Sequence, residues 1–165
     1  MDFAQLYLNA EGRISRKTWW LGSIGVVVLS LIASLVVAPI VVIVSGQSAT
    51  TEGIGELALL ALFFTPYRSL TFKRLNDRDR PHWLFWVFLG PSIASAVLKL
   101  LGVSGGYASF VLLGQEVEMF QPNIIGHFVN LALIVTFVWM LVEMGFLKGQ
   151  EGANTHGPDP LENEL

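Results

Sequence analysis

Residues that could take part in binding or catalysis gather in three polar segments, which read EGRISRKTWW (11–20), KRLNDRDRPHW (73–83) and GANTHGPDP (152–160). Arg13 and Arg16 are three residues apart and would share one face of a helix, and Arg74 and Asp77 have the same spacing. A guanidinium is a planar fork of donors that suits a carboxylate or a phosphate. The segments therefore predict ion pairs or anion recognition, for which Asp77 and Asp159 are the candidate carboxylates.

The composition excludes several kinds of site. The chain has no Cys, which excludes disulfides, thiolate catalysis and Cys-ligated metals. Its net charge of −3 gives no reason to expect a nucleic-acid partner. His82 and His156 have aspartates nearby, but no spacing matches H-E-x-x-H, a P-loop or G-x-S-x-G. We therefore expect a protein that is not an enzyme, with no catalytic residue, no metal site and no cofactor.

The elements that must position these polar segments are long apolar blocks. Hydrophobic residues make up 53% of the chain and charged residues 14%, whereas a soluble domain has about 45–50% and about 25%. Residues 22–44 carry no charge at all, and roughly 20 such residues span a bilayer core. This block is longer than the apolar core of a signal peptide, which is about 7–15 residues. It therefore predicts an integral membrane protein with a retained first span.

Four apolar stretches predict the fold class, an all-α integral membrane protein with four transmembrane helices. In front of them, Phe3, Leu6, Tyr7 and Ala10 recur at helical spacing, which is typical of a short amphipathic helix on the membrane surface. The segment 102–123 could lie flat on the membrane, dip into it or form a plain loop. The expected domains are an interfacial segment 1–18, a transmembrane domain 19–147 with spans at about 19–44, 56–72, 83–101 and 124–147, and a tail 148–165.

The positions of Lys and Arg predict the orientation. They occur before the first span, between the second and third, and after the fourth, whereas the segments 45–55 and 102–123 contain none. Basic residues in short loops stay in the cytoplasm. The sequence therefore predicts a multi-pass membrane protein with both termini cytoplasmic.

The three polar segments together resemble the motifs of the YhaH-like family, small bacterial inner-membrane proteins of unknown function. The family motifs are G-R-I-x-R-x-x-[FY]-W, R-R-L-H-D-x-G-x-S-G-W-W and G-x-N-x-[FY]-G-P-D-P. The resemblance implies a four-helix, multi-pass protein located in the bacterial inner membrane, and it lends no activity. Asn76 stands where the family has His, and an amide cannot transfer a proton as that His could. The matching residues are Gly12, Arg13, Ile14, Arg16, Trp20, Arg74, Leu75, Asp77, Trp83, Gly152, Asn154, Gly157, Pro158, Asp159 and Pro160.

These motifs predict a platform at the cytoplasmic face. The rigid G-P-D-P turn suggests that the tail folds back and places Asp159 against Arg13 or Arg74. The alternative is that the charges only obey the positive-inside rule and hold anionic lipid loosely, at about 1 kcal/mol for each basic residue. The expected platform residues are Gly12, Arg13, Arg16, Trp20, Arg74, Asp77, Trp83, Asn154, Gly157 and Asp159.

Two charges fall within the expected spans. Arg68 lies five residues before Lys73, and Glu143 lies five before Lys148, so both would sit about one turn inside the inner interface. Charges in a membrane are costly and normally pair. We expect an Arg68–Glu143 pair between the second and fourth spans, and the alternative is that each side chain extends separately to the interface.

The sequence favours a non-enzymatic platform that binds anionic lipid headgroups or a protein partner. An oligomeric small-solute transporter or channel subunit is the alternative, supported by Arg68, Glu143 and a face of the fourth span with His127 and Asn130. A membrane enzyme acting on headgroups would lack an evident nucleophile. Small residues at four-residue intervals in the first span allow close helix packing, within one chain or in a homo-oligomer; they are Ser30, Ser34 and Ala38.

Overall fold

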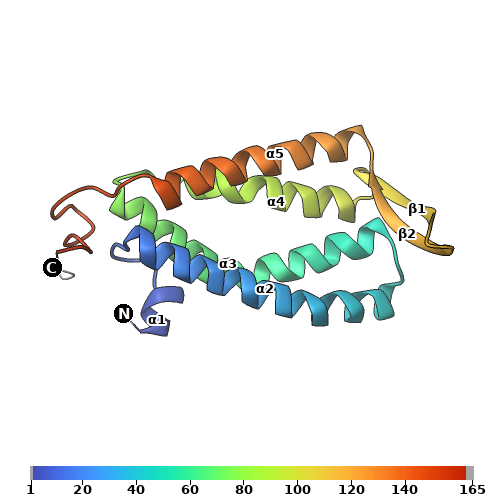
Figure 1. The fold of residues 1–165 in the computed structure, drawn as a ribbon, viewed down its shortest axis with the longest axis horizontal. Coiled ribbons are helices and arrows are strands. Elements are labelled where there is room, and N and C mark those ends of the chain that lie inside the picture. The colour runs from blue at the N-terminus through green and yellow to red at the C-terminus, as the bar shows by residue number, and fades with distance from the viewer. Residues whose placement is uncertain (1, 163–165) are drawn as a thin grey trace.

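The computed structural model describes residues 2–162. Four long helices run back and forth along one axis, and both ends of the described chain lie at one end of them, called here the terminal end (Figure 1). A β-hairpin lies at the opposite end. The elements in chain order are α1 (Phe3–Tyr7), α2 (Arg16–Ser45), α3 (Ala49–Asp77), α4 (Leu84–Leu100), β1 (Gly105–Leu112), β2 (Gln115–Pro122), α5 (Ile124–Met140) and the π-helical turn η1 (Leu141–Phe146).

Side-chain caps set the starts of three long helices. The side chains of Ser15, Ser48 and Asn123 accept hydrogen bonds from the backbone N–H groups at the starts of α2, α3 and α5, which satisfies donors that a helix start leaves free. Each long helix packs against the next, and α2 also packs against η1 at the terminal end. The helical stretches cover the four expected spans, and α3 extends past the expected 56–72 at both ends.

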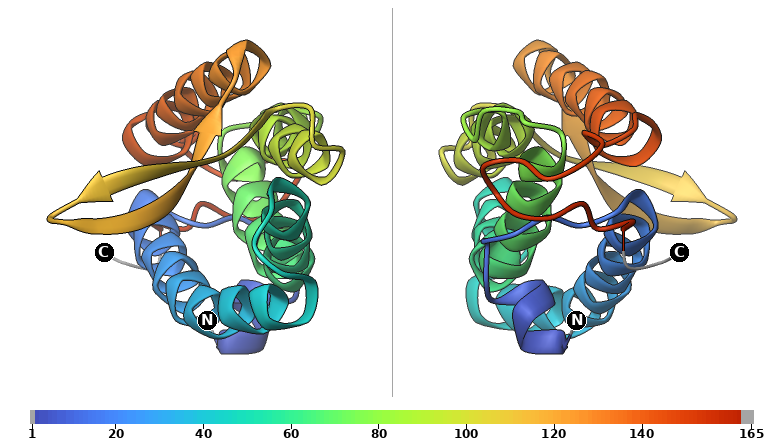
Figure 2. Two further views of the ribbon diagram at one scale, coloured as in Figure 1. Left: turned by 90° about the vertical axis from the view of Figure 1, so that its right-hand side faces the viewer. Right: turned by 90° about the vertical axis from the view of Figure 1, so that its left-hand side faces the viewer.

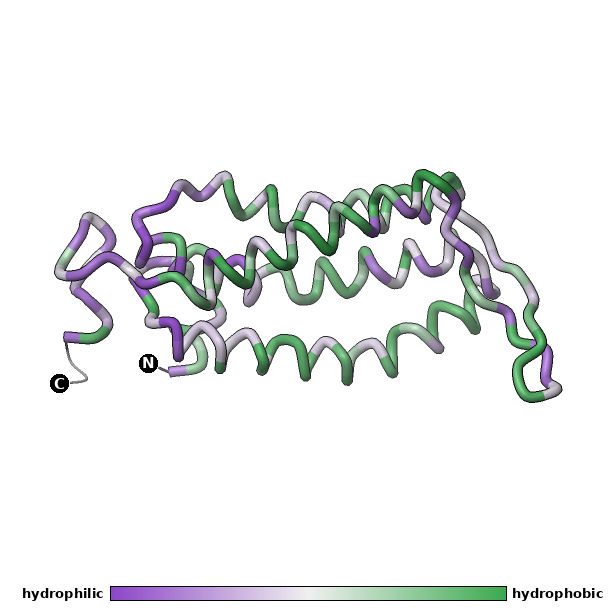
Figure 3. Tube along the Cα trace, turned by 45° about the horizontal axis from the view of Figure 1, so that its top comes forward, coloured by the Kyte–Doolittle hydropathy of each residue, from purple (hydrophilic) through white to green (hydrophobic). Residues whose placement is uncertain are grey.

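The chain is mostly helical, and within residues 2–162 two helices are long and apolar enough to cross a membrane. They are α2 and the continuous stretch of α5 and η1. Large apolar side chains are exposed on them, including Leu35 at 76% and Phe128 at 68%, which is typical of a surface that contacts lipid or a partner. Hydrophobic residues follow the middle of the helices, and hydrophilic residues gather at the terminal end (Figure 3).

The all-α prediction is wrong for residues 105–122, which form an antiparallel hairpin with Tyr107 paired to Phe120 and Leu112 to Gln115. Leu113 and Gly114 turn the chain with φ of 51° and 82°, as a two-residue hairpin turn with a mirror-image twist requires. β-Branched residues such as Val111 and Val117 favour strands. The hairpin differs from all three expectations for 102–123, which were a segment flat on the membrane, a segment that dips into it and a plain loop.

The N-terminal helix is shorter than its apolar spacing predicts. It ends at Tyr7, and Ala10 lies outside it. The ammonium of Lys73 donates to the backbone carbonyls of Gln5 and Leu6 in its last turn, where a helix leaves carbonyls without partners. Phe3 and Leu8 are exposed. The chain then runs without regular structure to Ser15, so Arg13 does not share a helix face with Arg16 as expected.

The buried core lies near the terminal end and supports the polar residues there. The Phe85 ring makes edge-on contacts with Phe64 and Phe72, with ring centroids 5.8 and 5.3 Å apart, a favoured aromatic geometry. Because this core joins α2, α3, α4 and η1, it fixes where their ends meet. Its buried members are Ile14, Trp19, Leu70, Leu75, Leu84, Phe85, Phe88, Leu89 and Met144.

Candidate functional site: a buried ionic cluster beside a basic pocket

Arg13 joins three parts of the chain that are far apart in sequence. Gly12, with φ of 87°, turns the backbone before it. The Nε and Nη2 atoms of Arg13 donate to Oδ1 of Asp77 over 3.2 and 3.1 Å. Its Nη1 also donates to the backbone carbonyls of Gly152 and Gly157, over 2.6 and 3.3 Å. Arg13 therefore ties the N-terminal motif to the end of α3 and to the tail.

Arg74 holds the other side of the same carboxylate. It lies one turn before Asp77 in α3, and its Nη1 pairs with Oδ2 of Asp77. Its Nε and Nη2 donate to the carbonyls of Met144 and Leu147 over 2.7 and 2.6 Å. The side chains of Arg74 and Asp77 are only 1% and 4% exposed. Arg74 thus fixes η1 against the end of α3.

Arg13, Arg74 and Asp77 form a buried ionic trio, in which burial and charge shift the pKa values of Arg74 and Asp77 in opposite directions. Burial lowers the pKa of Arg74 to about 10, and the nearby Asp77 carboxylate opposes that shift. Burial raises the pKa of Asp77, while the guanidiniums of Arg74 and Arg13 oppose it. Buried charges are tolerated where paired and hydrogen-bonded, so the trio holds the terminal end together.

The tail folds back onto the end of α3 through one backbone and one side-chain hydrogen bond. The Gln150 N–H donates to the Asp77 carbonyl over 2.7 Å, and the Asn154 side chain donates to the Asn76 carbonyl over 2.9 Å. Asp159 does not pair with Arg13 or Arg74 as expected. It accepts from the N–H groups of Leu161 and Gly152, and these bonds lower its pKa. The short Asp159 side chain closes the turn of the tail, and Asp77 takes both arginines instead.

A second ionic group lies beside the first. The carboxylate of Glu143 in η1 pairs with Arg78 over 3.2 Å and with Arg80 over 2.9 Å. The predicted Arg68–Glu143 pair is wrong, because Arg68 lies over the Phe72 ring at 5.1 Å. Arg68 is six residues, or about 9 Å along the helix, before Arg74, whose side chain contacts η1.

Asn76 connects all three motifs in place of the family histidine. Its side-chain nitrogen donates to the Gly12 carbonyl over 3.0 Å, and its carbonyl accepts from the Asn154 side chain. Its side-chain oxygen lies 2.6 Å from Nε2 of His82. Because the Asn76 amide already donates to Gly12, His82 is the donor in that pair. Burial and the nearby His156 and Arg68 lower the pKa of His82. This favours the neutral imidazole beside Asn76.

A basic pocket of about 310 Å³ opens beside the buried trio. The cations Arg16, Lys17 and Lys148 line it and are exposed. Arg74 and Asp77 form its buried wall, and tail residues 149–151 and 159–161 complete it, including the carboxylates of Glu151 and Asp159. The lining therefore holds four cations and three carboxylates, and three of the cations are exposed. The pocket can therefore present cations to an anion that approaches from outside.

An aromatic contact joins α2 to η1 next to this pocket. The Trp20 Nε1 donates to the Gly145 carbonyl over 3.2 Å, and its ring lies edge-on to Phe146 with centroids 5.9 Å apart. The guanidinium of Arg16 donates to the Phe146 carbonyl over 3.1 Å. The pocket therefore sits at the junction of α2 and η1.

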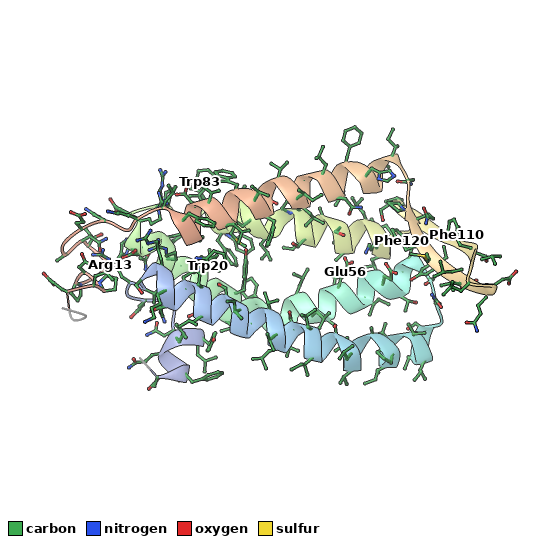
Figure 4. All side chains as sticks on the ribbon, in the orientation of Figure 1. Arg13, Trp20, Glu56, Trp83, Phe110 and Phe120 are labelled. Carbon is green, nitrogen blue, oxygen red and sulfur yellow. The ribbon has the colours of Figure 1, made fainter. Side chains whose placement is uncertain are left out.

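Most of the predicted platform residues lie near one another, around the trio and the pocket. Trp83 is the exception, since it precedes α4 and is 59% exposed. Arg13, Trp20 and Trp83 all lie toward the terminal end, with Glu56 and Phe120 toward the hairpin (Figure 4). Sequence reasoning missed Lys17, Lys148 and Gly149. The two lysines were counted only for their charge, and a glycine in a polar tail carries no signal of what it packs against.

Gly149 packs directly against the Asp77 carboxylate. A Cβ at this position would overlap both carboxylate oxygens, so Gly149→Ala is expected to displace the tail and cost about 1–3 kcal/mol, the usual range for overpacking. Limited proteolysis should cut the variant tail faster than the wild-type tail. Gly90→Ala is the control, because a Cβ there meets no atom within 4 Å. Equal cleavage rates for all three proteins would contradict the packing.

Comparison with known proteins agrees with the three motifs. A family described as "Protein of unknown function (DUF805)" matches residues 7–158. Inner membrane protein YhaH of Escherichia coli (strain K12) is 28% identical over 100 residues, which cover 61% of this chain and 79% of that protein, and YhaH of Escherichia coli O157:H7 gives the same values. No solved structure matches. The relatives and the apolar helices together support an inner-membrane location. The chain belongs to the DUF805 family of proteins of unknown function and is similar to YhaH.

Proposed function

We propose that the protein is a four-span inner-membrane platform that binds the headgroup of an anionic lipid in its basic pocket. Both termini would lie in the cytoplasm, and the hairpin on the opposite side. The observation that carries the proposal is the set of three exposed cations around a pocket of about 310 Å³. Anionic lipids of the cytoplasmic leaflet attract such cations by about 1 kcal/mol each.

The neighbours of the pocket fit this position at a membrane surface. Trp20 lies in the second turn of α2 and is partly exposed, and tryptophans concentrate where a membrane meets water. Phe3 and Leu8 expose apolar side chains at the same end of the protein. A headgroup in the pocket would therefore sit at the depth where lipid phosphates lie.

The roles of the arginines differ in this proposal. Arg13 and Arg74 are committed to Asp77 and to backbone carbonyls, so they shape the pocket rather than grip a ligand. The contacts to a phosphate fall to Lys17, Lys148 and the remaining donors of Arg16, whose Nη1 donates to the Phe146 carbonyl. We also propose a role without catalysis, since two guanidiniums hold Asp77, the one carboxylate in the buried wall of the pocket.

Native mass spectrometry of the protein released gently from membranes tests the proposal. The wild type is expected to retain a discrete anionic phospholipid. The triple variant Arg16→Gln, Lys17→Gln, Lys148→Gln should bind phosphatidylglycerol roughly 100-fold more weakly, from about 1 kcal/mol for each cation. Arg68→Gln is the control, because it removes an exposed cation of the same end that does not line the pocket.

Two results would count against the headgroup site. The first is equal phosphatidylglycerol retention by wild type and triple variant. The second is an equal loss of lipid in the triple variant and in Arg68→Gln, which would mean that charge alone matters. A co-purifying protein that only the triple variant loses would identify a protein partner in place of a lipid.

A further inference from the structure

The structure contains a second, apolar cavity of about 710 Å³ among all four long helices. Its inner wall includes Phe88 and Leu89 of α4, which are 5% and 6% exposed. Its outer rim includes Leu31 of α2 and Ile134 of α5, each 61% exposed. The cavity therefore opens sideways between α2 and α5, which lie apart in both end views (Figure 2).

Of the five hydroxyl groups on the cavity wall, all except that of Ser92 already donate a hydrogen bond within the protein. Ser30 and Ser34 donate to the backbone carbonyls three residues earlier, over 2.8 and 2.7 Å, and Thr136 donates to Ala132 over 2.7 Å. Tyr67 donates to the Met140 sulfur over 3.1 Å. An occupant therefore meets mainly hydrocarbon, which suits an alkyl chain better than an ion or a polar solute.

The apolar cavity and the basic pocket lie along the same seam. Lys17 lines the pocket and Val27 lines the cavity, and ten residues of helix separate them by about 15 Å. The rings of Trp20 and Phe146 lie between these levels. A phospholipid has a charged headgroup joined to hydrocarbon chains. The basic pocket and the apolar cavity follow each other along α2 in the same order.

We propose that the apolar cavity holds one acyl chain of the anionic lipid whose headgroup occupies the basic pocket. The chain leaves the pocket, passes the Trp20–Phe146 contact and enters between α2 and α5. This inference rests on the proposed function and adds that the protein recognises an intact lipid. A free phosphate or a headgroup fragment would satisfy only the pocket.

Photo-crosslinking of the full chain in nanodiscs tests this placement. The probe is phosphatidylglycerol with a diazirine in the middle of one acyl chain, and the comparison is phosphatidylcholine with the same chain. Phosphatidylglycerol is expected to label residues 26–34 and 133–140 several-fold more than phosphatidylcholine does. The triple variant Arg16→Gln, Lys17→Gln, Lys148→Gln should lose that excess.

A pair of substitutions in one helical turn tests the cavity itself. Ser34 lines the cavity, so Ser34→Phe should fill it and lower the labelling several-fold. Leu35 is 76% exposed and does not line the cavity, so Leu35→Phe should leave the labelling unchanged. Equal midpoints of thermal unfolding in detergent for Ser34→Phe and Leu35→Phe would show that the lost labelling does not come from unfolding.

Three results would overturn the inference. They are equal labelling by the two lipids, labelling spread evenly over the exposed faces of all helices, and labelling that Ser34→Phe leaves unchanged. If headgroup retention still depends on the three cations, the basic pocket stands and only the chain site fails. If no anionic lipid is retained at all, the proposed function fails with it.

Discussion

Replacement of Asp77 by asparagine is expected to destabilise the protein by about 3–5 kcal/mol, because breaking a buried ion pair leaves its partners uncompensated. Asn keeps the shape of the side chain and removes its charge. Arg13 and Arg74, whose side chains are each 1% exposed, would then share a neutral amide. A charge buried without a partner costs far more than a surface ion pair contributes.

Loss of the trio should also free the tail. Asp77 accepts hydrogen bonds from the same Arg13 guanidinium that donates to the carbonyls of Gly152 and Gly157. Asp77→Asn is therefore expected to lower the midpoint of thermal unfolding in detergent and to speed proteolysis of residues 148–162. Glu11→Gln is the control, since it neutralises an exposed carboxylate near the same motif. An Asp77→Asn midpoint equal to that of Glu11→Gln would mean that the trio contributes no stability.

The importance of the trio changes which substitutions can report on ligand binding. Arg13 and Arg74 are the most obvious cations to neutralise from the sequence, because both belong to the motifs. In the structure they are buried and bonded to backbone carbonyls. Their removal would disturb folding, and any loss of lipid would follow from that. Lys17 and Lys148 are exposed in the pocket, so their substitution separates binding from folding.

The helices could be predicted because their signal is local. The uncharged run 22–44 needs no information from the rest of the chain. The pairing of Arg74 with Asp77 is also local, since both lie on one face of α3. The hairpin was missed because its strands are short and it stands between strongly apolar helices.

The contacts between distant segments could not be predicted in the same way. Charge alone makes Asp77 and Asp159 equivalent partners for Arg13. Only the packed structure shows that Asp77 reaches Arg13 while Asp159 bonds to its own tail. The place of Gly149 against Asp77 is likewise set by the path of the tail. Spacing along the chain carries no information on which of several like charges will meet a given partner.

Replacement of Glu143 is expected to cause the second large loss of stability, and it distinguishes the observed partners of Glu143 from the Arg68 partner that the sequence suggested. Glu143→Gln is expected to destabilise the protein by about 3 kcal/mol, the lower end for a broken buried pair. We expect the lower value of that range because only one of the two partners is buried: the Arg78 side chain is 10% exposed and the Arg80 side chain is 49% exposed. Arg78 also has a buried Nε without a hydrogen-bond partner among the described residues, so it depends on Glu143.

Arg68→Gln is the matched comparison, and it is expected to cost less than about 1 kcal/mol, since it removes only an exposed cation–π contact. Thermal unfolding of both variants in the same detergent measures the difference. The double variant Arg68→Glu, Glu143→Arg should be no more stable than Glu143→Arg alone, because Glu143 meets Arg78 and Arg80 instead. Recovery of stability in that double variant would restore the Arg68–Glu143 pair and contradict the arrangement of η1 against α3.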